Sequence, residues 1–427
     1  MVLFLPYSID IKGMSKRGSI MNVNSERLLS RLKEFGNVGR DSKERLARIA
    51  ITDADKLGRD NLVAWMQAAD LKVAVDRIGN IHGIWKPDSV TDPEPIMMGS
   101  HIDTVLNAGI YDGNYGVLAG LEVILTLQEC NFAPSRPIVV SAFSNEEGAR
   151  YAPDMMGSLV YAGGLSVDEA LETVGLDGSV LGSELERIGY AGHNEPGFMQ
   201  PKAYVELHIE QGPVLENLNI PIGAVENLQG ISWQRITITG TANHAGTTPM
   251  SMRSDAGIAT AKVMIYLRDF VTQKGDCMVS TVGSINFEPN IINVIPSKSE
   301  FTVDLRSPNE DDLKDAEMNL NHYLKEIQEI EGVTVSVERL ARFEPVTFDK
   351  GLVETIEAAS NSRGLTSKRM TSGAGHDAQM MARICPSAMI FVPSKDGISH
   401  NPKEYTEPEE LVAGANVLLD TVRAIAI

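Results

Sequence analysis

Histidines and carboxylates follow apolar runs at several points of this 427-residue chain. His101 and Asp103 come directly after the run Ile96–Gly99, and Asp112 lies eleven residues beyond His101. A histidine and a carboxylate at strand ends are common metal ligands, and Asp103 can accept the second ring N–H of His101 and so fix its tautomer. A surface loop with incidental histidine and aspartate residues is the alternative for this motif taken alone.

A pair of adjacent carboxylates, Glu146 and Glu147, follows the apolar run Ile138–Phe143. Neighbouring carboxylates at a strand end repel each other unless a cation or a proton lies between them. One of the two can therefore ligate a metal while the other acts as a general base. A solvated acidic turn is the alternative interpretation.

Two further histidines lie in or after strand-like segments. Polar and apolar residues alternate in Tyr204–Glu210, so a strand would place His208 and the other polar side chains on one face. His400 follows the apolar run Ala388–Val392, in the segment Gly397-Ile398-Ser399-His400-Asn401. A solvated strand face and a structural histidine are the respective alternatives.

Together these residues form a set of mixed chemistry. Three of the eight histidines, His101, His208 and His400, accompany Asp112 and Glu147, and this set suits zinc or a similar first-row metal. If Asp112 bridges two ions, they would lie about 3.5–4 Å apart, as in two-metal hydrolases. The His-Glu-x-x-His motif of single-zinc proteases is absent, and the cysteines that a structural zinc site favours lie outside these motifs.

The elements that must position these residues alternate between helices and strands. Apolar residues recur at helical spacing between Leu28 and Phe35, behind Ser25 as a candidate N-cap. The alternation that follows predicts an α/β fold with a mostly parallel sheet flanked by helices, in which ligands bind beyond the carboxyl ends of the strands. The predicted segments are helix Asp53–Ala69, strands Lys72–Val75, Ile81–Trp85 and Ile96–Gly99, helix Val117–Leu127 and strand Ile138–Phe143.

Residues 226–341 show a different order, β-α-β-β-α-β, which is typical of ferredoxin-like domains. We therefore expect an α+β domain at 226–341, inserted into a larger domain made of 24–225 and 342–427, with 1–23 as a disordered extension. The larger domain resumes with strand Ala388–Val392 and ends with helix Pro408–Ile425. The segments predicted in the insertion are strand Ser232–Thr239, helix Ala256–Phe270, strands Met278–Asn286 and Glu300–Arg306, helix Glu310–Ile330 and strand Val333–Val337.

Composition and charge exclude several classes of protein. The formal net charge is −19, and no cluster of Lys and Arg supplies the basic face that nucleic-acid binding needs. No apolar run approaches the roughly 20 residues that span a bilayer. Cys130, Cys277 and Cys385 are too scattered for a disulfide framework, and the N-terminus lacks the basic region of a signal peptide. We therefore expect a cytoplasmic protein with neither a nucleic-acid nor a membrane partner.

Seven motifs carry a resemblance to a known family. In chain order they are GSHIDTV, YDG, NEEGARY, ELHIEQGPVLE, NHAGTTPM, SGAGHDAQ and GISHNPKE. The chain resembles the hydantoinase/carbamoylase amidase family, relatives of the two-zinc aminoacylase-type peptidases. Its members include N-carbamoyl-L-amino-acid hydrolases, beta-ureidopropionases and allantoate amidohydrolases. The resemblance runs from Asn24 to the C-terminus, and the combination of motifs is highly specific although single motifs are not.

The resemblance implies two divalent metal ions per subunit. His101, Asp112 and His208 would hold one ion. Asp112 would bridge to the second ion, which Glu147 and His400 would also hold. Zinc is the expected metal, with manganese, cobalt and nickel as alternatives that suit such ligands.

It also implies roles for two neighbouring carboxylates. Glu146 would be the general base that takes a proton from water, and Asp103 would support the metal ligands from behind.

The same resemblance implies that the inserted domain is a dimerisation or lid domain. His244 would reach the active site of the partner subunit in a homodimer and stabilise the developing oxyanion there; from sequence alone a structural loop histidine is the alternative. Arg306 would pair bidentately with the substrate carboxylate, where the alternative is a surface salt bridge. Asn293 and Gln211 would add polar contacts.

Three residues of SGAGHDAQ are expected near the substrate. His376 would lie close to the site, with a role that the sequence does not define. Gly373 and Gly375 would present backbone N–H groups to the ligand, or simply form a turn.

The expected reaction is hydrolysis of the terminal ureido group of a small carboxylate-bearing compound. N-carbamoyl-L-amino acids are the leading substrate class and allantoate is the alternative; an N-acyl amino acid or dipeptide comes after both. A non-catalytic metal- or ureide-binding protein on the same scaffold is a second class. Glu146 beside a full ligand set favours the enzyme.

Overall fold

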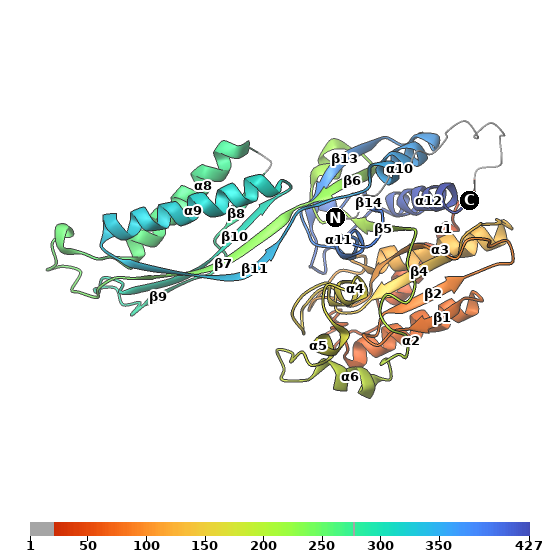
Figure 1. Cartoon of the computed structure of the whole chain (residues 1–427), viewed down its shortest axis with the longest axis horizontal. Coiled ribbons are helices and arrows are strands. Elements are labelled where there is room, and N and C mark those ends of the chain that lie inside the picture. Colours follow the sequence, from red (N-terminus) through yellow and green to blue (C-terminus); the bar gives the residue numbers. More distant parts are fainter. Residues whose placement is uncertain (1–20, 276–277) are drawn as a thin grey trace. The chain divides into compact units, whose positions relative to one another are not determined.

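The computed structural model describes residues 21–275 and 278–427 (Figure 1). Contacts divide the chain into two compact units, one running up to Glu226 and resuming at Phe348, the other comprising Asn227–Thr347. Residues 1–20 of the expected extension 1–23 lie outside the described residues, and Cys277 does as well. In the described ranges, no helix combines the length and the apolar composition that a membrane crossing requires.

The first unit is built on a mixed sheet with the strand order β1-β2-β4-β3-β5-β14-β6 and β13 beside β6. The four strands β4, β3, β5 and β14 in its centre run parallel, whereas β1, β2 and β6 pair antiparallel with their neighbours. The strands are β1 (Lys72–Val75), β2 (Ile81–Trp85), β3 (Ile96–His101), β4 (Ile138–Phe143), β5 (Ala203–Ile209), β6 (Ile222–Leu228), β13 (Ser367–Ser372) and β14 (Ser387–Val392).

The expectation of an α/β fold with helices around a sheet is confirmed, but the sheet is parallel only in its centre. The connection between β1 and β2 contains five residues, Asp76–Asn80, too few for the crossover that a parallel pair needs. These two strands therefore form a hairpin at one side of the sheet.

Helices cover both faces of this sheet. On β5, Leu207 points toward Gly414 of α12, whereas Glu206 on the opposite face accepts a hydrogen bond from the backbone of Ala378 in α11. The two faces of β5 are thus buried by different helices, and all seven of its residues are buried. The helices of this unit are α1 (Ser25–Phe35), α2 (Asp53–Ala68), α3 (Asn114–Glu129), α4 (Met156–Tyr161), α5 (Val167–Leu171), α6 (Leu181–Ile188), α7 (Val214–Leu218), α10 (Lys350–Ser362), α11 (Asp377–Met381) and α12 (Pro408–Ile425).

The four motifs with candidate ligands follow the four parallel strands. His101 ends β3, Glu146 and Glu147 follow β4, His208 is the penultimate residue of β5, and the loop with His400 follows β14. Parallel strands end at the same edge of a sheet, so the fold gathers these side chains at its carboxyl edge.

The second unit has the order β-α-β-β-α-β of a ferredoxin-like domain if β8 and β9 are counted as one interrupted strand. Its antiparallel sheet has the strand order β11-β7-β10-β8, with β9 also on β10. Alternate residues of β10 are buried, because α8 and α9 pack on one face of this sheet (Figure 1). Its elements are β7 (Gly230–Thr239), α8 (Ala256–Lys274), β8 (Val279–Thr281), β9 (Ile285–Glu288), β10 (Lys298–Ser307), α9 (Glu310–Glu331), β11 (Thr334–Phe343) and β12 (Val346–Thr347).

Two local predictions were wrong. The expected strand Met278–Asn286 is divided into β8 and β9, with Gly283 in the break, where a residue without a side chain weakens a strand. Helix α1 is capped by Asn24 and not by Ser25, because the Asn24 side chain accepts a hydrogen bond from the backbone N–H of Arg27.

Candidate metal centre

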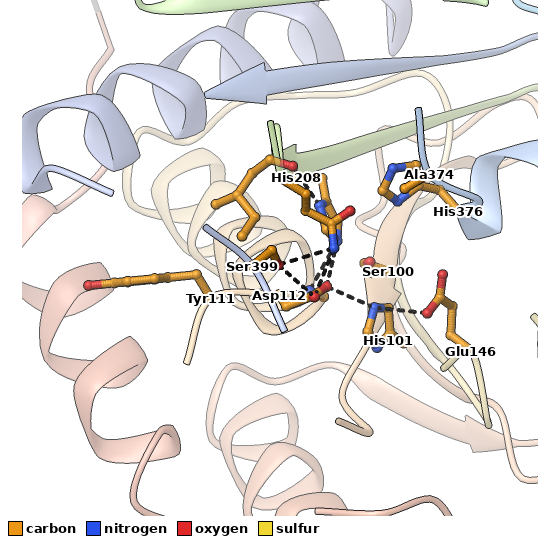
Figure 2. A network of polar contacts seen from close by, with 12 residues as sticks. Ser100, His101, Tyr111, Asp112, Glu146, His208, Ala374, His376 and Ser399 are labelled. Atoms are coloured by element: carbon orange, nitrogen blue, oxygen red, sulfur yellow. Dashed lines mark hydrogen bonds and ion pairs between the residues drawn. The ribbon is translucent and has the colours of Figure 1, made fainter. Parts of the chain in front are cut away.

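Three predicted ligands meet where β3, β5 and the start of α3 come together (Figure 2). Nε2 of His101 lies 3.6 Å from Oδ1 of Asp112, and Nε2 of His208 lies 3.2 Å from the same oxygen. All three side chains are buried. The strands fix both histidines, so this group has little freedom to rearrange.

The second oxygen of Asp112 faces two other predicted ligands. Nε2 of His400 lies 3.2 Å from Oδ2 of Asp112 and 3.3 Å from Oε2 of Glu147. Asp112 thus directs one oxygen toward each group of ligands. A carboxylate that bridges two metal ions needs this arrangement.

Gly113 permits Asp112 to point into this space. It is the N-cap of α3 with a φ of 64°, and its N–H donates to Nε2 of His208 at 3.1 Å. A Cβ at this position would lie 2.4 Å from Cε1 and Nε2 of His101. The left-handed backbone and the contact with the ring both require glycine.

Backbone carbonyls orient the two buried histidines. Nδ1 of His101 lies 3.0 Å from the backbone oxygen of Asp103, and Nδ1 of His208 lies 2.9 Å from that of Ile209. A carbonyl oxygen only accepts, so each Nδ1 carries the proton and donates it. In the neutral rings, the unprotonated nitrogen is then Nε2, on the side of Asp112.

The carboxylate of Asp103 differs from our expectation. It does not accept a hydrogen bond from the ring N–H of His101, because Oδ1 of Asp103 lies 3.8 Å from Nδ1 of His101. Its two oxygens instead accept hydrogen bonds from the backbone N–H groups of Glu146 and Glu147, each at 3.2 Å. Asp103 therefore holds the loop with the two glutamates against β3.

The ligands strongly perturb one another's protonation. Burial alone would raise the pKa of Asp112, but hydrogen bonds with His101, His208 and His400 hold it well below its usual range. The hydrogen bond with Asp112 raises the pKa of His400 to about 9. Burial, followed by the charge of Asp112, raises the pKa of Glu147 to about 8. The cluster thus holds protons that a cation would displace.

Glu146 lies beside the first group, with Oε2 3.3 Å from Nε2 of His101 (Figure 2). Burial raises its pKa well above the usual range despite the opposing effect of His101, and the charges of Asp377 and Glu147 raise it further. A buried carboxylate with high proton affinity next to metal ligands has the properties of a general base.

Gln211 and His376 contact the ligands themselves. Nε2 of Gln211 donates to Oδ2 of Asp112 at 2.9 Å. The His376 ring packs edge-on against the His208 ring, with centroids 4.5 Å apart, and its Nε2 lies 3.1 Å from Oγ of Ser372. Burial and the neighbouring His208 hold the pKa of His376 well below its usual range, so a neutral ring packs against this candidate ligand.

Gly375 precedes His376 in the turn between β13 and α11. A Cβ on Gly375 would lie 3.0 Å from Cε of Met155, so a larger residue here would make the Met155 side chain shift.

His244 and Asn293 lie together in the second unit. His244 pairs with Val294 in an isolated β-bridge, and the N–H of Ala245 donates to the backbone oxygen of Asn293 at 2.9 Å. Nδ1 of the exposed His244 accepts hydrogen bonds from the backbone N–H groups of Gly246 and Thr247, at 3.0 and 3.2 Å. These donors leave the proton of the neutral ring on Nε2.

Arg306 lies on β10, on the sheet face opposite α8 and α9. Its guanidinium forms an ion pair with Asp304, two residues earlier on the same face, with Nη2 3.0 Å from Oδ2. The surface salt bridge that was the alternative interpretation of Arg306 is therefore present.

Two buried carboxylates near the site make contacts that the sequence did not predict. Glu206 accepts hydrogen bonds from Ser100, Tyr204 and Ala378 beneath the first group. Glu404 accepts hydrogen bonds from the backbone of Asp112, among others. Glu206 was visible as part of a polar strand face and Glu404 as the end of GISHNPKE, but only the contacts identify what each one holds.

The donor atoms fit metal ions. The groups His101–Asp112–His208 and Asp112–Glu147–His400 each place their ligand atoms within 4.8 Å of one another. A third group, Glu206–His208–His376, meets the same distance, but the oxygens of Glu206 are already used by three donors. The cluster of histidine and carboxylate ligands in the described part of the chain can therefore hold metal ions of the zinc type. The solvated strand face considered for Tyr204–Glu210 is wrong, since these side chains are buried.

Comparison with known proteins relates this geometry to a family. A model described as peptidase family M20/M25/M40 matches residues 97–424. The chain is 39% identical over 409 residues to the N-carbamoyl-L-amino-acid amidohydrolase of Rhizobium meliloti. This alignment covers 96% of this chain and 98% of that protein. It is 34% identical over 363 residues to the allantoate amidohydrolase of Bacillus subtilis, or 84% of this chain and 88% of that protein. A solved amidase of the hydantoinase/carbamoylase family from Burkholderia multivorans has a TM-score of 0.91 and 39% identity, covering 95% of this chain and 98% of that one.

Proposed function

This chain belongs to peptidase family M20/M25/M40, and from that premise we propose that it is a two-metal amidohydrolase that cleaves the ureido C–N bond of N-carbamoyl-L-amino acids. The resemblance to hydantoinase/carbamoylase amidases is confirmed by the relatives and by the solved structure. One observation carries the proposal: the two oxygens of Asp112 face separate groups of ligands at 3.2–3.6 Å. The substrate class is inferred from the named relative.

The proposed metal ligands are His101, Asp112 and His208 for one ion and Asp112, Glu147 and His400 for the other. Zinc is the leading candidate, with manganese, cobalt and nickel also compatible with these nitrogen and oxygen donors. Bound divalent ions would supply Lewis-acid activation of water and of the ureido carbonyl.

Glu146 accepts a proton from the attacking water in this proposal and passes it to the leaving nitrogen. Its burial and its contact with His101 support this role, because a base of raised pKa can both take up and release a proton near neutral pH. One water is consumed, and the products are the amino acid, carbon dioxide and ammonia.

Residues of the second unit complete the substrate site in the proposal. The Nε2–H of His244 donates a hydrogen bond to the developing oxyanion, and the backbone donors on Nδ1 support this tautomer. Arg306, now paired with Asp304, contacts the substrate carboxylate, and Asn293, tied to the same loop as His244, adds a polar contact. Gln211 and the backbone around Gly375 add polar contacts from the first unit.

The proposal includes a homodimer, in which His244 acts at the partner subunit's site. Two features of the second unit support an interface between copies: α8 exposes Ile258 and Ile265, and β8 ends the strand order of its sheet with Val279 exposed. An exposed strand edge beside an apolar helix face favours pairing with another chain. Equilibrium sedimentation checks this; a fully active monomer would exclude His244 acting in trans.

Ammonia release by the metal-reconstituted protein tests the function directly. N-carbamoyl-L-amino acids and allantoate are compared side by side, and we expect the carbamoyl amino acids to be the better substrates. A preference for allantoate, which the similarity to the Bacillus subtilis enzyme makes the second candidate, would change the substrate but not the chemistry. Bound metal without turnover of either class would contradict the proposal; N-acyl amino acids would then be tested first, and inactivity on these as well would favour a metal- or ureide-binding protein.

A further inference from the structure

Glu404, the last residue of the motif GISHNPKE, joins two loops of the metal centre. It is 5% exposed and lies in the loop after β14 that carries His400. Its Oε1 accepts hydrogen bonds from the backbone N–H of Tyr111 at 3.0 Å and of Asp112 at 3.2 Å. Its Oε2 accepts a hydrogen bond from Oγ of Ser399 at 2.8 Å. One side chain thus binds the loop before α3 and the loop after β14.

Ser399 closes this connection into a ring. Oγ of Ser399 lies 3.3 Å from Oδ2 of Asp112 (Figure 2). Nε2 of Gln211 is within hydrogen-bond distance of both groups, 3.3 Å from Oγ of Ser399 and 2.9 Å from Oδ2 of Asp112. Gly109 provides the space, since a Cβ there would lie 2.2 Å from Oε1 of Glu404. Three donors and a close-fitting wall therefore give the Glu404 carboxylate a single orientation.

His400 is the candidate ligand that its own element supports least. His101 and His208 are buried on strands, whereas His400 lies in a loop with 52% of its side chain exposed. Its φ is 53°, a left-handed conformation that is uncommon for residues other than glycine. Its position must therefore come from contacts that its neighbours in the loop make.

We propose that Glu404 is a positioning residue that holds the His400 loop in register with Asp112. It thereby sets the metal affinity of the site formed by Asp112, Glu147 and His400. This inference rests on the proposed two-metal function. Glu404 acts through the ligands, because it binds the backbone of Asp112 and the hydroxyl next to His400.

The chemistry of the side chain explains why a glutamate is present. A second carboxylate close to Asp112 is electrostatically unfavourable, so its contacts must compensate for the repulsion. Both oxygens of a carboxylate accept hydrogen bonds, whereas an amide accepts at one end only. Glutamine could serve the two backbone donors, and its NH₂ group would then face Ser399, whose proton would turn toward Asp112.

Calorimetric titration of the metal-free protein with Zn²⁺ alone tests this inference. We expect Glu404→Ala to lower the binding affinity for one of the two ions about 10- to 100-fold, as the loss of a residue that supports metal ligands typically does. The affinity for the other ion should not change. Glu404→Gln should recover part of this loss. His400→Ala identifies the affected ion and His101→Ala the other, while Lys403→Ala, exposed in the same loop, should bind as the wild type does.

Other outcomes overturn the inference. An equal loss of Zn²⁺ affinity at both sites, or a lower Tm with unchanged affinities, would show that Glu404 only stabilises the fold in general. If Glu404→Ala does not fold, Glu404→Gln and Ser399→Ala decide, because their effects on the His400 ion should be non-additive in the double variant. A wild-type protein that binds one ion would contradict the two-metal proposal, and the comparison of Glu404→Ala with His400→Ala would still decide the role of Glu404.

Discussion

At the scale of single residues, the candidate metal centre is a cluster of groups whose charges depend on one another. Asp112 is held ionised by three histidines, while Glu147 and His400 keep protons to about pH 8 and pH 9. Both protons must leave before Glu147 and His400 can act as ligands, since a metal binds the carboxylate and the neutral imidazole.

This requirement predicts how metal binding depends on pH. Below about pH 8 both groups are protonated, so each displaced proton should lower the affinity by about tenfold per pH unit of acidification. The affinity of the His400 site should therefore rise from pH 6 and level off above about pH 9. Titration calorimetry in buffers of different ionisation enthalpy counts the released protons. An affinity that does not change over this range would contradict the prediction.

Replacement of the proposed base gives a second prediction. Glu146→Gln keeps the size of the side chain but cannot accept the proton, so kcat should fall about 10²- to 10⁴-fold. Metal content and Tm should stay near the wild-type values, because Glu146 is not among the proposed ligands. The exposed Glu169→Gln serves as the control, and an active Glu146→Gln variant would exclude the assignment.

Sequence analysis could predict the candidate ligands because histidines and carboxylates recur at the ends of several apolar strands, although each motif alone has an ordinary structural alternative. It could not identify Glu404 or define His376, since their roles depend on contacts with distant segments: Glu404 with Asp112, and His376 with the ring of His208. Asp103 shows the same limit. The sequence placed it near His101 but not against the backbone of Glu146 and Glu147.

At the scale of elements, the start of α3 is the most constrained position. Gly113→Ala would introduce a Cβ 2.4 Å from the His101 ring in a left-handed backbone. We expect Zn²⁺ affinity at the His101 site to fall at least tenfold, measured by calorimetry, because the ring must move away from Asp112.

The matched control for this variant is Gly178→Ala. Gly178 has a φ of 80° and no heavy atom within 4 Å of the added Cβ. This variant carries only the conformational penalty of about 1–2 kcal/mol and should bind metal normally. Equal metal affinity in the two variants would show that contact with His101 is unimportant.

Long periodic elements could be predicted from the sequence, and helix Pro408–Ile425 has the expected bounds. The exceptions have local causes. Gly283 divides one strand of the second unit, and a short turn makes β1 and β2 a hairpin at the side of a parallel centre. Periodicity reports which face is buried but not the direction of the neighbouring strand, which depends on the length of the connection.

At the scale of the whole molecule, the chain leaves and re-enters the first unit at one point. The N–H of Phe348 donates to the backbone oxygen of Glu226 at 3.0 Å. The expected insertion at 226–341 ends earlier than the observed unit Asn227–Thr347, because β11 runs to Phe343 and β12 pairs with the end of β6. The hydrophobic pattern could indicate the inserted domain, but not this final pairing of two residues.

The adjacent ends predict that the insertion can be removed. A short Gly-Ser linker in place of Asn227–Thr347 should leave a chain that folds and binds metal, since all five proposed ligands lie in the first unit. Turnover should fall by about 10²-fold or more, because His244 and Arg306 are lost. Metal analysis and ammonia release check both parts. Undiminished turnover would exclude a role for the second unit in the reaction.

The place of β14 in the sheet has a consequence for biosynthesis. β14 pairs with β5 on one side and with β6 on the other, yet it begins at Ser387, long after β6 ends at Leu228. At about 5–20 residues per second, the ribosome needs roughly 8 to 32 s to make the segment between them. Throughout that interval β5 and β6 each lack their common neighbour and expose an open edge. His400 and Glu404 are made later still, so the proposed His400 site can take up an ion only after β14 and the loop that follows it have been made.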